Sequence, residues 1–166
     1  MTTHDMKRTT GLMLAIVLLL GMTQVARAQN QRDFASQFMR LYAQDDASLK
    51  CQTVSPLMME RIMNLETVEN NENIKAVMGQ LKSIQILTSV GAENSEDNYQ
   101  KAIALAETNN RRYQLYKARE RGAIYLRRRK NVIVELVFVN KSTDTFHMVN
   151  LTGNMTEDFI DALAKI

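Results

Sequence analysis

The sequence contains little cysteine, glycine or histidine, and each shortage excludes a class of site. Cys51 is the only cysteine, so no disulfide can form within the chain. The 6 glycines are scattered between Gly11 and Gly153, so they form neither a P-loop nor a dinucleotide-binding fingerprint. His147 is the only histidine after residue 28, and with Cys51 it cannot supply the three or four ligands of a zinc site without several carboxylates. We therefore expect no cofactor and no metal.

The sequence also lacks a convincing set of catalytic residues. A nucleophilic pair would need Cys51 and His147 to meet beside a third, orienting group, and nothing in the sequence requires that meeting. The adjacent acids Asp45–Asp46 and Glu157–Asp158 are typical of helix ends and solvated charge. Only Lys50 stands close enough in sequence to stabilise a Cys51 thiolate, so an inert thiol is expected. We expect a protein that is not an enzyme; a cryptic hydrolase or thiol enzyme is the alternative.

The one long apolar run lies near the N-terminus and predicts export. Lys7 and Arg8 precede the apolar stretch 12–20, and Ala26-Arg27-Ala28 follows it as a small-x-small cleavage pattern. We expect residues 1–28 to be a signal peptide that is cleaved before Gln29. The run is shorter than the roughly 20 residues that span a bilayer, so no transmembrane anchor is expected after cleavage. The predicted location is the periplasm or the exterior.

Residues 29–166 are long enough for a single domain with its own core, and they contain no repeat or flexible linker. Residues 1–28 carry three basic residues and one acidic residue, so most of the net charge of +3 lies in the predicted signal peptide. The remaining chain is nearly neutral and has no overall attraction to polyanions. Nucleic acid is therefore not an expected partner.

Apolar residues at helical and alternating spacing predict an α+β fold. Helices are expected over 34–43, 55–63, 74–81, 95–109 and 156–166. Strands are expected over 84–88, 113–118, 123–128, 132–140 and 145–152. Short turns join the last four strands, which predicts an antiparallel meander, and 132–140 should be central because both of its faces are apolar. The predicted architecture is one antiparallel sheet of four or five strands with helices packed on it.

The main charge asymmetry lies in one predicted hairpin. Nine basic residues fall between Arg111 and Lys130, with Glu120 the only acid among them. Alternation along the two strands places pairs of these cations on common, solvent-facing surfaces. The candidate patch comprises Lys117, Arg119, Arg127 and Arg129. Such a patch is either a charged edge that discourages aggregation or a surface for an acidic protein, an anionic glycan or a lipid headgroup.

Several segments of the chain resemble a known family. They are Ser55-Pro56-Leu57-Met58, Ile84-Gln85-Ile86-Leu87, Tyr113-Gln114-Leu115 and Asn150-Leu151-Thr152-Gly153-Asn154. These resemble the domain of unknown function 4252 family, which comprises small exported bacterial proteins. The resemblance implies an exported α+β domain and transfers no catalytic residues. Many members are lipoproteins, whereas this leader has no cysteine at its cleavage site.

These observations predict an exported, non-catalytic binding or accessory protein of the bacterial envelope. Besides an enzyme, the other alternative is a structural or assembly component that uses a sheet edge or the methionine-rich segment Met58–Met63 as an interface. The sequence leaves the oligomeric state open.

Overall fold

The computed structural model describes residues 32–65 and 71–163. The predicted signal peptide lies outside the described residues. Within them, no helix has the length and apolar character needed to cross a membrane.

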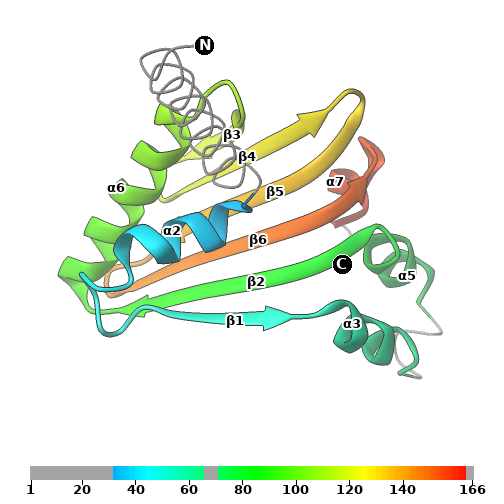
Figure 1. The fold of residues 1–166 in the computed structure, drawn as a ribbon, viewed down its shortest axis with the longest axis horizontal. Helices are drawn as coiled ribbons and strands as arrows, with labels where there is room; N and C mark the ends of the chain where they lie inside the picture. Colours follow the sequence, from blue (N-terminus) through cyan, green and yellow to red (C-terminus); the bar gives the residue numbers. More distant parts are fainter. Residues whose placement is uncertain (1–31, 66–70, 164–166) are drawn as a thin grey trace, which may run out of the picture. The chain divides into compact units, whose positions relative to one another are not determined.

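The centre of the fold is one antiparallel sheet of six strands (Figure 1). Its order is β1-β2-β6-β5-β4-β3, so the last four strands form the predicted meander and β5 lies inside the sheet. The strands are β1 (Lys50–Val54), β2 (Leu81–Val90), β3 (Gln114–Arg119), β4 (Gly122–Arg129), β5 (Val132–Lys141) and β6 (Thr145–Met155). The prediction of four or five strands was wrong by one. The missing strand is β1, which is almost wholly exposed and therefore has no apolar alternation to reveal it.

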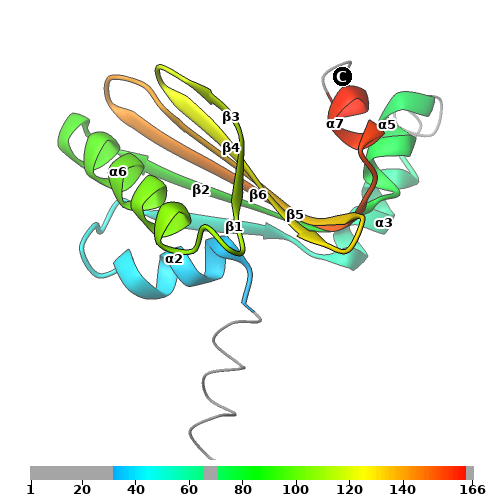
Figure 2. The ribbon, with the colours of Figure 1, turned by 90° about the horizontal axis from the view of Figure 1, so that it is seen from above.

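Helices pack on both faces of the sheet, but at opposite ends (Figure 2). One face holds α2 (Phe34–Tyr42) and α6 (Ala92–Thr108). The other face holds α5 (Glu72–Met78) and α7 (Asp158–Leu163), with α3 (Pro56–Met63) beside α5. Side-chain caps begin three of these helices: Asp33 accepts from the Ser36 amide, Ser55 from the Met58 amide, and Asn71 from the Asn73 and Ile74 amides.

Each helical layer covers its own apolar core. Under α2, the Phe38 ring stacks on Phe146 at 5.8 Å and Phe34 meets Tyr113 edge-on at 5.0 Å. On the opposite face, α5 and α7 cover a second apolar core that includes Leu126, Leu136, Leu151 and Phe159. Because the second layer stops short of the β5–β6 turn, part of that face carries no helix (Figure 2).

Candidate ligand-binding groove

The uncovered part of the sheet carries an apolar row across four strands. Register partners lie on the same face, and Ile124 opposes Phe138, Phe138 opposes Val149, and Val149 opposes Ile86. All four side chains are at least partly accessible, and Phe138 is 36% exposed. The solvated face of an antiparallel sheet is commonly polar, so this accessible apolar row marks the candidate site, whose floor includes Ile124 and Phe138.

Over β3, β4 and β5, two members of this row belong to a groove with a volume of about 540 Å³. Ile124 and Phe138 line the floor, Tyr116 lines the side formed by β3, and Ile160 of α7 lines the far end. Ligand pockets in proteins span roughly 300 to 1,000 Å³, so the groove can hold a small ligand or several side chains of a partner.

Three cations line the groove beside the apolar floor. Lys117 and Arg119 lie on this face because they oppose Ile124 and Gly122 in the β3–β4 register, and Arg121 follows in the turn. Within residues 32–65 and 71–163, no carboxylate makes an ion pair with any of the three. Asp161 of α7 also lines the groove. The site therefore combines apolar surface, three uncompensated positive charges and one separate negative charge.

The structure does not bring the other two predicted patch residues to this site. Arg127 opposes Glu135 on the other face of the sheet, and its Nε donates to the Glu135 carboxylate at 2.6 Å. Arg129 opposes Val132 beside the β4–β5 turn, at the far end of β4 from Gly122. The expectation that Arg127 faces solvent is corrected by this ion pair, since its side chain is only 21% exposed.

Glu135 is a buried carboxylate that anchors α2. Besides the bond from Arg127, it accepts from the Phe34 amide at 2.5 Å and from the Tyr113 hydroxyl at 3.2 Å. The neighbouring Ala35 amide donates to the Asn150 side chain at 2.7 Å. Burial raises the pKa of Tyr113 well above its usual value, and the Glu135 charge adds to that rise, so the hydroxyl stays protonated as a donor. The first free amides of α2 are thus satisfied by strands β5 and β6.

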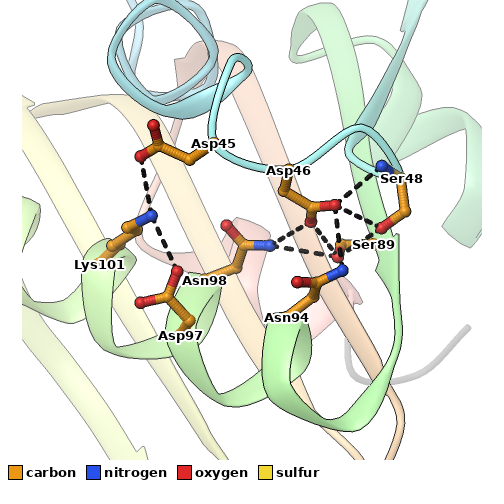
Figure 3. A network of polar contacts seen from close by, with 8 residues as sticks. All are labelled: Asp45, Asp46, Ser48, Ser89, Asn94, Asp97, Asn98 and Lys101. Atoms are coloured by element: carbon orange, nitrogen blue, oxygen red, sulfur yellow. Dashed lines mark hydrogen bonds and ion pairs between the residues drawn. The ribbon is translucent and has the colours of Figure 1, made fainter.

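Asp46 forms a second buried polar centre (Figure 3). Its Oδ1 accepts from the Ser48 amide at 2.8 Å, from the Ser48 hydroxyl at 2.7 Å and from Asn94 at 3.2 Å. Its Oδ2 accepts from Ser89 and from Asn98, the latter at 2.7 Å. Burial raises the pKa of Asp46, but the hydrogen bonds outweigh burial and the net pKa lies below the ordinary value. Both oxygens are occupied by the chain itself, which indicates a structural clamp between the loop after α2, β2 and α6.

An ion-pair bridge reinforces this clamp. The Nζ of Lys101 lies 2.9 Å from Asp45 and 2.8 Å from Asp97 (Figure 3). Hydrogen bonds from the ammonium to Asp97 and then Asp45 raise the pKa of Lys101. The expected solvated role fits Asp45 but not Asp46, which is 6% exposed.

The structure keeps Cys51 and His147 apart. Cys51 opposes Leu87, and Leu87 opposes Met148, which places the thiol on the α2 side of the sheet. His147 opposes Thr88 and Asn140 on the other side. Partial burial raises the pKa of the Cys51 thiol, although a hydrogen bond involving Thr53 works against that rise. Among the described residues, no group of three or more histidine, cysteine or acidic side chains is arranged to hold a metal ion.

Comparison with known proteins relates the chain to a family. No curated protein and no solved structure matches the chain. The model of the family described as Domain of unknown function (DUF4252) matches residues 27–163, which include every element of the sheet and both helical layers. The sequence resemblance is thereby confirmed: the chain belongs to the DUF4252 family.

Proposed function

We propose that this chain is an exported, non-catalytic binding protein of the bacterial envelope that holds an anionic partner in the groove. The observation that carries the proposal is the convergence of Lys117, Arg119 and Arg121, none of them ion-paired within the described part of the chain, on an apolar floor. Export is supported by the leader pattern in residues 1–28.

The physical basis is the combination of charge and apolar surface. A cation beside low-dielectric surface attracts an anion more strongly than a fully solvated cation does. The Phe138 and Ile124 side chains also offer area whose burial is favourable, at about 25 cal/mol per Å². A partner that carries both an anionic group and an apolar group would satisfy both parts of the groove.

Two alternatives predict different behaviour. If the cations only prevent sheet-to-sheet aggregation, their removal should promote association of the protein with itself and leave anion binding unchanged. If the protein is a thiol enzyme, Cys51 should be essential for activity. The placement of Cys51 and His147 on opposite faces gives that enzyme no support.

The test compares two double variants that lose the same charge. Lys117→Gln with Arg119→Gln removes cations from the groove, whereas Arg111→Gln with Arg129→Gln removes exposed cations in the turn before β3 and at the end of β4. Binding of fluorescent polyglutamate is measured over a range of salt concentrations. We expect the groove variant to bind roughly tenfold more weakly, since each exposed ion pair contributes up to about 1 kcal/mol.

The control variant should bind nearly as well as the wild type, and wild-type binding should weaken with salt as the screening length shrinks. Equal losses in both variants would show that only net charge matters, and the proposed groove function would then be rejected.

A further inference from the structure

We propose that the partner is an extended acidic peptide segment that pairs with the free edge of β3. This inference rests on the proposed function and adds the class of partner and its binding mode. β3 is the last strand of the sheet, so one side of its backbone has no strand neighbour among the described residues. All six of its residues are exposed. An exposed edge of this kind is a template for a strand from another chain.

The spacing of the cations favours a peptide. Lys117 and Arg119 lie two residues apart on one face of β3, which separates them by roughly 7 Å at the rise of a strand. In a strand paired with β3, alternate side chains have the same spacing as Lys117 and Arg119 and lie on the same face of the sheet. Acidic residues at alternate positions of a peptide would therefore each meet one cation, whereas a lipid headgroup offers its charge at a single point.

The charge at the far end of the groove also disfavours an anionic lipid. Asp161 and Ile160 of α7 lie beyond the apolar floor. An anionic lipid whose headgroup was held by the three cations would leave its apolar chain in a groove that this carboxylate also lines. A peptide can instead place a polar or basic residue there, because successive side chains differ.

The same features disfavour a second copy of this chain as the partner. Two β3 edges paired together would set Lys117 and Arg119 against like charges, which destabilises cross-strand pairs. The edge of β3 is thus suited to pairing with an acidic strand and not to pairing with the β3 edge of a second copy.

The probe for this inference is a fluorescein-labelled hexapeptide of alternating glutamate and valine. Its affinity is measured by fluorescence anisotropy for the wild type and for the two double variants described above. A second peptide carries N-methyl groups on the edge that would face β3, which removes the main-chain donors and keeps every side chain. A lysine–valine hexapeptide controls for charge, and vesicles of phosphatidylglycerol test the lipid alternative.

Strand pairing predicts that N-methylation weakens binding about tenfold or more, because several main-chain hydrogen bonds are lost. It also predicts slower amide hydrogen exchange in β3 when the unmodified peptide is bound. Equal affinity of the two peptides with no protection of β3 would overturn the edge pairing and leave the groove function intact.

Binding of the vesicles but not of the peptide, with loss only in the groove variant, would overturn the peptide assignment in favour of a lipid. If the protein binds neither the peptide nor the vesicles, this inference is overturned. If the polyglutamate comparison also shows no difference between the two double variants, the proposed function is rejected too.

Discussion

At the scale of single residues, two buried carboxylates organise the helical layer formed by α2 and α6. Glu135 receives the N-terminus of α2, and Asp46 fixes the loop after it. The sequence could not predict either role, because donors come from distant segments: Phe34 is 101 residues from Glu135, and Ser89 and Asn98 are 43 and 52 residues from Asp46. Local patterns describe neighbours along the chain, whereas these partners meet only after the sheet forms.

The first prediction concerns Asp46. Asp46→Asn should destabilise the domain by about 1 to 3 kcal/mol, because the new amide group places a donor where Ser89 and Asn98 already donate. Denaturant unfolding at neutral pH measures this loss. Asp45→Asn, which removes only an exposed ion pair, is the matched control and should cost less than about 1 kcal/mol.

The depressed pKa of Asp46 adds a pH dependence. A carboxylate whose folded pKa lies below its unfolded value, near 3.9, stabilises the fold above that value and loses the contribution as the pH falls through the folded pKa. Wild-type stability should therefore fall more steeply below about pH 4 than that of Asp46→Asn. Parallel curves for the two proteins would contradict the clamp.

The second prediction concerns Arg127. Removing it in Arg127→Gln leaves the Glu135 charge buried without its cation, which should cost about 3 to 5 kcal/mol. Arg129→Gln, on the exposed end of the same strand, should change stability by only about 0.5 kcal/mol. Chemical denaturation midpoints of the two variants distinguish these outcomes, and similar midpoints would place Arg127 on the solvent side after all.

At the scale of elements, periodicity predicted most of the fold. The five helices and the strands β2 to β6 appear where apolar spacing placed them, with ends shifted by a few residues. β1 was not predicted because it has no buried apolar face of its own and is held by its pairing with β2. The sequence also did not predict the close contact between the start of β2 and β6. That contact depends on Gly153, which is more than seventy residues away along the chain.

The third prediction tests that contact. A Cβ on residue 153 would overlap the backbone carbonyl of Gln80, to which the Asn154 amide also donates. Gly153→Ala should therefore force β6 away from the start of β2 and destabilise the domain by about 1 to 3 kcal/mol. Thermal unfolding measures the loss. A melting temperature equal to that of the wild type would show that the backbones can separate without cost.

At the scale of the whole molecule, the groove lies where α5 and α7 leave part of their face of the sheet without a helix (Figure 2). The sequence identified the cations of the hairpin, and the structure places Lys117 and Arg119 at the groove. It could not identify the groove itself, since the floor residues Ile124 and Phe138 read as ordinary core positions. Which of these positions remain uncovered depends on where α7 packs on the sheet, and that is a property of tertiary packing.

The fourth prediction concerns export. The cleavage pattern at Ala26-Arg27-Ala28 should yield a mature chain that begins at Gln29 and needs no detergent for extraction. Intact-mass analysis of the protein from cell envelopes measures the N-terminus. Retention of Met1, or release only by detergent, would argue for a membrane-anchored form.

Nuclear magnetic resonance tests most directly the proposal that the groove over β3, β4 and β5 is the binding surface. A ¹⁵N-labelled sample of the folded protein is titrated with unlabelled polyglutamate. We expect shifts concentrated at β3, Arg121, Ile124 and Phe138, with little change around Arg129. Shifts centred on Arg129 and the β4–β5 turn, or spread evenly over all surface cations, would contradict it.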